Sequence, residues 1–213
     1  MTMDNSLHPE QVRWIERYRR TGFRAFGMEP TVWLRRHEEL LRRLVPGPIL
    51  DVAAGNGRNA FYVAHLGFEV DALDISDLAV HWIGQQARSR QLRVNPHWAN
   101  LASENLPSDQ YRVVVNTNYL ERRLFPGIKS TLLPGGLLLF ETMTWNQVDR
   151  LGGSMDRRFL LAPNELRNAF CDLQILAYRE GVFDCQSTGK PRAVASLVAR
   201  KTADKPGDNN DEA

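Results

Sequence analysis

Apolar and polar positions along the chain repeat with two different periods, which predict helices and short strands. Residues 9–20 and 30–45 place apolar side chains every three or four positions, as an amphipathic helix does. After Pro48, short apolar runs bounded by glycine, proline or polar residues predict strands at 49–53, 68–74, 111–116 and 137–142, and residues 93–99 are predicted to form the third strand. Helical patterns predict helices between these strands at 58–66, 76–91 and 121–133.

The last third of the chain departs from this alternation. A long loop at 143–161 and a short helix at 163–170 precede two predicted strands, 173–179 and 193–200. Strands that alternate with helices form a parallel sheet covered on both faces, and the two consecutive strands suggest a hairpin at one edge. We therefore predict a single α/β domain with a Rossmann-like three-layer architecture. Its seven-stranded, mostly parallel sheet is expected to end in a C-terminal antiparallel hairpin.

Individual residues within these segments allow more detailed predictions. Val12 and Ile15 should share the buried face of the first helix, and His37 should be a packed histidine on the apolar stripe of the second. Pro126 predicts either a kink in its helix or a helix that begins there. Residues 134–136, a Pro-Gly-Gly sequence, predict a turn.

The composition is that of a globular protein. The 213 residues are 43% apolar and 24% charged, which excludes a wholly disordered chain, a collagen and a disulfide-stapled miniprotein. This length accommodates one domain with a small appendage. We expect N-terminal helices at 1–45 that act as a lid or cover, the main domain at 46–201, and a disordered tail at 202–213.

Charge and cysteine content narrow the class of protein further. The net charge of +2 argues against a dedicated nucleic-acid binder. No apolar run approaches the roughly 20 residues of a membrane-spanning helix, and the N-terminus has no secretory signal pattern. Cys171 and Cys185 are too few for a disulfide framework. We expect a soluble cytoplasmic protein that binds neither nucleic acid nor a membrane.

A glycine turn between the first strand and its helix indicates a nucleoside-cofactor site. Residues 55–60 read G-x-G-x-x-A, and Asp74 ends the next strand. Such a turn lets the backbone approach a ligand, the helix N-terminus offers free N–H groups, and the acid accepts hydrogen bonds from ribose hydroxyls. NAD would use the same turn. Three features argue against NAD as the cofactor: the two preceding helices, Asp51 on the first strand, and the Pro-Gly-Gly sequence directly before the fifth strand.

With these motifs together, the sequence resembles the class I S-adenosylmethionine-dependent methyltransferases. Its Gly-Asn-Gly-Arg-Asn turn at 55–59 is most similar to the tellurite-resistance branch of that family. The matched pieces are 49–57, 70–76, 100–107, 111–120 and 132–142. The chain departs from the family at Ala53, where a glycine is usual, and at Asn100, where an acid is usual. No histidine follows Phe170, so a branch histidine in the terminal hairpin has no match here.

The resemblance implies S-adenosylmethionine as the cofactor, with no metal, and assigns roles along the cleft. Asp74 would bind the ribose hydroxyls while Ile75 packs on the adenine. The side chain of Asn100 and the backbone of Leu101 would contact the adenine edge. The methionine part would be held by the turn and the strands beside it, which involves Asp51, Ala53, Gly55, Gly57, Arg58 and Asn116. For Arg58, a solvated position in the first helical turn is an equal alternative.

The acceptor is expected over the carboxyl ends of the strands. Candidate residues facing it are Asn118, Tyr119, Arg122 and Arg158. Trp14, Tyr18 and Trp33 are expected either to form a lid or to pack in the core. No general base is evident, because His65, His81 and His97 fall on expected surfaces. Catalytic residues therefore stay unassigned.

We predict a methyltransferase that acts on a small molecule with a soft or ionised nucleophile, such as a chalcogen, thiol or carboxylate. A macromolecular substrate would call for an added binding domain or a broad basic face, and the sequence has neither. The alternatives are an NAD-binding oxidoreductase and a non-catalytic S-adenosylmethionine-binding protein. The identity of the acceptor and the oligomeric state stay open.

Overall fold

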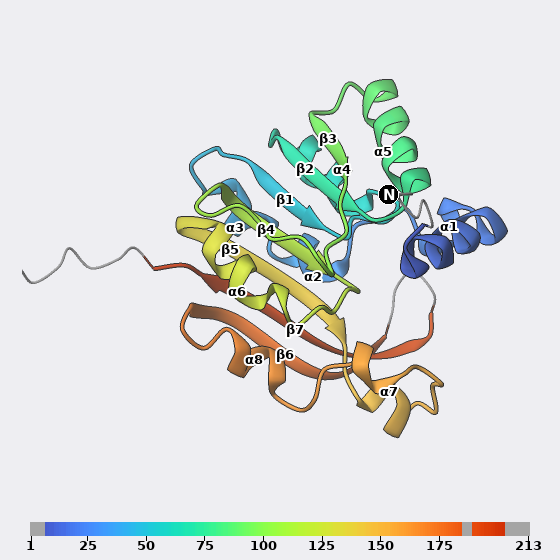
Figure 1. Cartoon of the computed structure of the whole chain (residues 1–213). Helices are drawn as coiled ribbons and strands as arrows, with labels where there is room; N and C mark the ends of the chain where they lie inside the picture. The colour runs from blue at the N-terminus through green and yellow to red at the C-terminus, as the bar shows by residue number, and fades with distance from the viewer. Residues whose placement is uncertain (1–6, 185–188, 203–213) are drawn as a thin grey trace, which may run out of the picture.

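A computed structural model describes residues 7–184 and 189–202 of the chain. Five parallel strands alternate with helices, and two antiparallel strands complete the sheet (Figure 1). The strands are β1 (Ile49–Val52), β2 (Val70–Asp74), β3 (Val94–Trp98), β4 (Tyr111–Thr117), β5 (Leu132–Met143), β6 (Gln174–Asp184) and β7 (Pro191–Arg200). Their order is β3-β2-β1-β4-β5-β7-β6, with β7 antiparallel to both neighbours. The predicted fold class is confirmed.

Helices cover both faces of the sheet and enclose two apolar cores. On one face lie α2 (Val32–Arg36), α3 (Glu38–Arg42), α4 (Arg58–His65) and α5 (Asp77–Ser89). On the other lie α6 (Leu124–Thr131) and α8 (Glu165–Ala169). Every residue of β1 is buried, which explains why its sequence is a continuous apolar run interrupted only by Asp51. The strand order reverses beside β1, where parallel sheets open a crevice at their carboxyl ends.

The helices before β1 pack in two different places. Trp33, Leu34 and Leu41 of α2 and α3 are buried in the core, so these helices belong to the main domain. Ahead of them, α1 (Pro9–Thr21) and the 3₁₀ helix η1 (Phe23–Phe26) lie beyond the carboxyl ends of the strands, beside α5 (Figure 1). Gln11 donates a hydrogen bond to Asp77 at 3.0 Å and ties α1 to α5.

Several local predictions are corrected by the structure. Val12 is 37% exposed, because the buried face of α1 runs through Gln11, Ile15 and Tyr18 instead. The helix predicted at 30–45 is two helices separated at His37. The Nδ1 atom of His37 lies 2.8 Å from the carbonyl oxygen of Trp33, the group its own backbone N–H would bind in a continuous helix.

The region after β4 also differs in detail. The helix α6 begins at Leu124, three residues later than predicted, and Pro126 lies in its first turn, where proline is tolerated. Residues 134–136 form no separate turn, because β5 runs through them with a shift in its register against β4. The loop at 143–161 contains α7 (Asn146–Asp149) and the 3₁₀ helix η2 (Arg157–Phe159). The strands β6 and β7 are longer than predicted, and the predicted tail beyond residue 202 lies outside the described residues.

Candidate functional site

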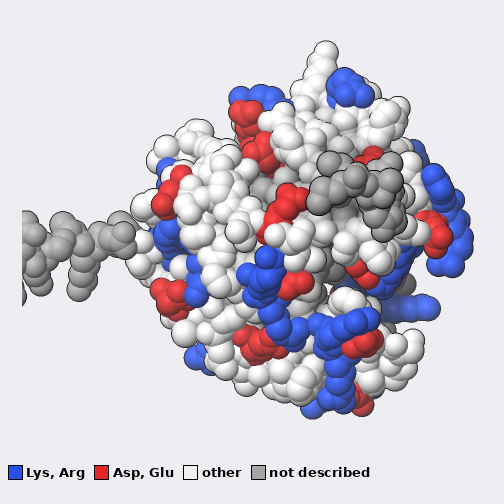
Figure 2. Space-filling view, viewed as in Figure 1, with Lys and Arg blue, Asp and Glu red and all other residues white. Residues whose placement is uncertain are grey.

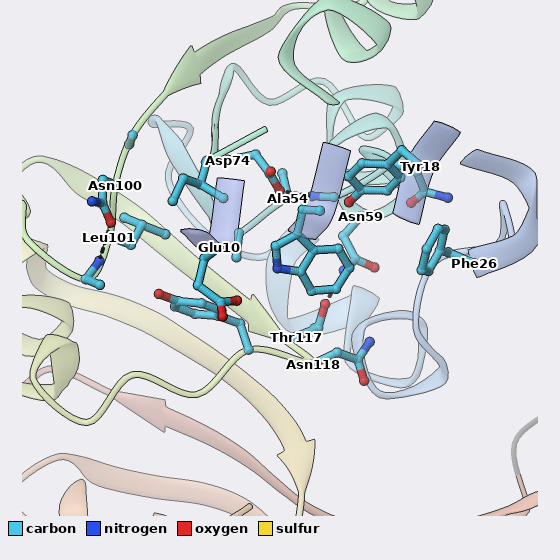
Figure 3. Close-up of a pocket in the computed structure, with 18 of the residues that line it drawn as sticks. Glu10, Tyr18, Phe26, Ala54, Asn59, Asp74, Asn100, Leu101, Thr117 and Asn118 are labelled. Carbon is cyan, nitrogen blue, oxygen red and sulfur yellow. Dashed lines mark hydrogen bonds between the residues drawn. The ribbon is translucent and has the colours of Figure 1, made fainter. Parts of the chain in front are cut away.

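A cleft lies at the carboxyl ends of β1, β2 and β4, where the predicted site residues meet. It is lined by His8, Glu10, Trp14, Tyr18, Phe26, residues 53–56, Arg58, Asn59, Asp74, Ile75, residues 99–102 and residues 117–119. Asn100 and Leu101 lie at one end of the cleft and Tyr18 and Phe26 at the other, with Asp74 between them (Figure 3). The two ends of the cleft are therefore built by different elements.

The glycine turn has a separate physical reason for each of its glycines. Gly57 has φ +78°, and a Cβ there would lie 2.8 Å from Cζ of Phe61 and 3.0 Å from Cγ1 of Ile83. Gly55 has φ +62° and opens into the cleft, where a Cβ would lie 3.4 Å from the Tyr18 hydroxyl. Gly57 thus allows α4 and α5 to pack against the turn. Gly55, which has no side chain, leaves open the part of the cleft below the Tyr18 hydroxyl. Ala53 also adopts a left-handed conformation, with φ +53°, which accounts for the glycine usual there.

Asp74 is the central acid of the cleft. Its Oδ2 accepts a hydrogen bond from the Gly55 N–H at 2.8 Å, and its Oδ1 accepts one from the Ser76 N–H at 2.9 Å. The side chain is only 6% exposed, and this burial raises the pKa of Asp74 to about 6. Each carboxylate oxygen keeps a lone pair for a further donor. Asp74 therefore connects the glycine turn to the start of α5 and presents an acceptor to the cleft.

The end of the cleft beyond Asp74 is formed by Ile75, Asn100 and Leu101. The Asn100 side-chain oxygen accepts a hydrogen bond from the Ala102 N–H at 3.2 Å. This bond engages the oxygen of the side chain that was predicted to contact the adenine edge, and leaves the amide nitrogen as the more available group. The Leu101 carbonyl oxygen accepts a bond from Arg123 at 3.2 Å.

Three predicted cofactor residues do not line the cleft. Asp51 and Asn116 are each 1% exposed and lie behind the glycine turn. Asp51 accepts a hydrogen bond from the Ala60 N–H at 3.1 Å, and burial raises its pKa to about 7. Asn116 donates to the carbonyl oxygen of Tyr119 at 2.9 Å. These two side chains, like Gly57, shape the turn and the strand ends rather than the cleft surface.

Aromatic side chains of α1 and η1 form a roof over the cleft. Trp14, Tyr18 and Phe26 line it, with the Tyr18 ring centroid 5.8 Å from that of Trp14 and 5.3 Å from that of Phe26. Phe23 stacks on Tyr18 at 4.5 Å and on Trp82 of α5 at 4.8 Å. Of the three aromatic residues predicted either as lid or as core, Trp14 and Tyr18 form this roof, whereas Trp33 is in the core.

Polar side chains of the glycine turn hold the roof in place. Asn56 donates to the carbonyl oxygens of Phe23 at 3.1 Å and Gly27 at 2.7 Å. Arg58 donates to the carbonyl oxygen of Phe26 at 2.8 Å. Asn59 accepts from the Thr31 N–H at 3.0 Å and donates to the Thr117 hydroxyl at 2.8 Å. The role of these asparagines in holding the roof could not be predicted from the turn alone, because Phe23, Gly27 and Thr31 lie about 30 residues earlier in the chain.

The four candidate acceptor residues fall into two groups. Asn118 and Tyr119 line the cleft, and the Asn118 side-chain oxygen accepts a hydrogen bond from Arg192 at 2.7 Å. Arg122 and Arg158 do not line it. Arg122 binds Glu165 at 2.5 Å and donates to the backbone carbonyl oxygen of Arg158 at 2.8 Å. The guanidinium of Arg158 lies 3.0 Å from Asp156 and over the ring of Phe159. Both arginines thus stabilise the segment before α8.

A second cavity lies beside the first, and Arg58 lines both. Glu29, Glu141, Asp184, Arg35, Arg179 and Arg192 are its other charged residues. Glu141 accepts hydrogen bonds from Arg179 at 3.1 Å and from Ser196 at 2.6 Å. Residues 7–184 and 189–202 contain no cluster of three or more side chains suited to a metal ion. None of the helices described there is long and apolar enough to cross a membrane.

Comparison with known proteins identifies relatives for most of the chain. The family model described as "Tellurite resistance protein TehB" matches residues 34–192. A probable S-adenosyl-L-methionine-dependent methyltransferase TehB of Haemophilus influenzae is 24% identical over 169 residues, 73% of this chain and 58% of that protein. A probable S-adenosylmethionine-dependent methyltransferase of Mycobacterium tuberculosis is 33% identical over 119 residues, 52% of this chain and 42% of its own. The chain therefore spans about half the length of these relatives.

Solved structures share the fold. The crystal structure of TehB from Haemophilus influenzae superposes with a TM-score of 0.68 at 21% identity, covering 79% of this chain and 62% of its own. A geranyl diphosphate C-methyltransferase from Streptomyces coelicolor, solved with S-adenosyl-L-homocysteine, superposes with a TM-score of 0.61 at 15% identity, covering 79% of this chain and 76% of its own. At these identities the likeness establishes the fold.

Proposed function

Because the chain belongs to the family of the tellurite resistance protein TehB, we propose that it binds S-adenosylmethionine in the cleft and transfers its methyl group to a small molecule. The observation that carries this proposal is Asp74, a buried acid that ends β2 inside the cleft and is bonded to the glycine turn. A carboxylate in this position accepts the two hydroxyls of a ribose.

The residues of the cleft suit this cofactor. Asp74 retains acceptor capacity on both oxygens, and Gly55 leaves open the space that a Cβ would fill. Glu10 and Asp74 are acidic, whereas Arg58 is the cleft's basic residue among those described. An acidic cleft with aromatic walls favours a ligand that carries a sulfonium and an ammonium group.

When bound, the cofactor supplies an electrophilic methyl group. The chain's own contribution is then to hold and align both partners and to keep water out, and such alignment can supply roughly 7–11 kcal/mol of a reaction barrier. The aromatic roof over the cleft performs this role here. His65, His81 and His97 are exposed and do not line the cleft, so none of these three is placed to act as a general base there.

We propose that the acceptor is a small molecule with a soft or ionised nucleophile and that it approaches past Asn118 and Tyr119. The second cavity adjoins this point through Arg58 and through the bond between Asn118 and Arg192. Its arginines suit an ionised group. Basic and acidic side chains are interspersed on the face viewed in Figure 2, an arrangement that favours a small ligand over a nucleic-acid backbone.

Turnover is the test that separates this proposal from its alternatives. The protein is expected to convert S-adenosylmethionine to S-adenosylhomocysteine when supplied with thiols, chalcogen oxyanions or small carboxylic acids, with product measured by mass spectrometry. Binding without turnover across this panel would favour a non-catalytic cofactor-binding protein. Micromolar affinity for NAD together with no affinity for S-adenosylhomocysteine would overturn the proposal.

The pKa of Asp74 predicts how cofactor binding depends on pH. Ribose hydroxyls donate to the ionised carboxylate, so affinity should rise as the pH rises through about 6. A group with this pKa is about tenfold more ionised at pH 7 than at pH 5. Calorimetry with S-adenosylhomocysteine should therefore show an affinity that is up to about tenfold higher at pH 7 than at pH 5. Asp74→Asn should bind weakly with no such change, and an equally steep profile in this variant would assign the pH dependence to another group.

A further inference from the structure

Tyr18 is the residue through which the N-terminal roof reaches the glycine turn. It lies on the buried face of α1 and is 5% exposed. Its ring is fixed by Phe23, Phe26 and Trp14 on three sides. Its hydroxyl oxygen lies 3.4 Å from the position that a Cβ of Gly55 would occupy. The ring is therefore held rigidly with its hydroxyl at the cleft wall, directly over the turn.

This hydroxyl has no hydrogen-bond partner among the residues that the structure describes. A buried hydroxyl is normally hydrogen-bonded, and one that lacks a partner in the protein but lines a cleft is suited to a ligand. Other polar groups nearby are already engaged, since Asn56 and Asn59 bind the backbone at Phe23, Gly27 and Thr31. Tyr18 stands out as an unused donor.

The arrangement of the cleft indicates which part of the cofactor this donor meets. Asn100 and Leu101 mark one end, Asp74 the middle, and Tyr18 and Phe26 the other end (Figure 3). With adenine beside Asn100 and ribose on Asp74, the amino-acid part extends toward Tyr18. A neutral O–H donor there complements a carboxylate, whereas the acids Glu10 and Asp74 would repel it.

We propose that the Tyr18 hydroxyl donates a hydrogen bond to the carboxylate of the methionine part of S-adenosylmethionine, so that the N-terminal roof recognises the cofactor's amino-acid end. This inference rests on the proposed function, because it needs the cofactor in the cleft. Tyr18 is then a binding residue supplied by α1 rather than a core aromatic. The glycine-turn side chains Asn56 and Arg58 position it by fixing the backbone of η1.

The test compares two ligands in Tyr18→Phe, which keeps the ring and its packing and removes only the hydroxyl. S-adenosylhomocysteine and 5′-methylthioadenosine share the adenosine and the sulfur, but the second lacks the amino acid and its carboxylate. We expect Tyr18→Phe to weaken S-adenosylhomocysteine binding about tenfold, the size of a bond to a charged group, and 5′-methylthioadenosine binding less than twofold. Isothermal calorimetry measures both affinities without any turnover.

A matched control is Tyr62→Phe on α4, which removes a hydroxyl that donates to Glu38 outside the cleft. It should leave both affinities unchanged. If Tyr18→Phe lowers the affinity for both ligands equally, the hydroxyl contacts the adenosine part and the assignment is overturned. The assignment is also overturned if neither affinity changes. Failure of the unsubstituted protein to bind S-adenosylhomocysteine would instead overturn the proposed function, so the two failures are distinguishable.

Discussion

Asp74→Ala is expected to weaken the binding of S-adenosylhomocysteine by about 1.5–3 kcal/mol, the usual contribution of hydrogen bonds to a charged group. The carboxylate lies in the middle of the cleft and is the acceptor that we propose for the ribose hydroxyls. Its loss should affect adenosine-containing ligands with and without the amino acid alike, in contrast to Tyr18→Phe. Isothermal calorimetry at pH 7.5 measures the change directly.

Two further variants keep this experiment interpretable. Asp74→Ala also removes the acceptor of the Gly55 and Ser76 N–H groups, so Asp74→Asn, which retains one oxygen, should lose affinity with a smaller loss of stability. Asp71→Asn is the matched control, since Asp71 is on the same strand but bonds to Tyr111 and Asn95 away from the cleft. Wild-type affinity in a folded Asp74 variant would remove this residue from the site.

Gly57→Ala is expected to lower the free energy of unfolding by about 2–5 kcal/mol. A side chain at φ +78° costs roughly 1–2 kcal/mol of backbone strain, and overpacking costs roughly 1–3 kcal/mol more. The added methyl would meet Phe61 of α4 and Ile83 of α5, two buried residues that cannot move away easily. Urea denaturation followed by circular dichroism gives the change in unfolding free energy.

Gly152→Ala separates the two parts of this effect. Gly152 has φ +68°, but a Cβ there would meet nothing within 4 Å, so only the backbone strain should appear. The loss at Gly57 should therefore exceed the loss at Gly152 by the overpacking contribution. Equal losses at the two positions would contradict the close packing of α4 and α5 against the turn.

The sequence by itself determined the order of the elements and the centre of the site. Strands β1, β4 and β5 follow from short apolar runs, because a strand buried on both faces needs consecutive apolar residues. Gly55, Gly57 and Asp74 were predicted together, because the turn and the strand end after it are read from nearby residues. The helix predicted at 76–91 is α5, and Ser76 caps it by accepting a hydrogen bond from the Ala79 N–H.

Only the tertiary structure decided which residues complete the cleft. Tyr18 lies 37 residues before Gly55, and Asn56 finds its partners at Phe23 and Gly27. Periodicity predicted a buried face for α1 but not what it would cover. Arg122 follows β4 as an acceptor residue would, yet its guanidinium binds Glu165 of α8. A hydrophobic pattern predicts the environment of its own segment, whereas a hydrogen bond depends on where two distant segments meet. The roof and its hydrogen-bond partners could therefore be identified only from the folded chain.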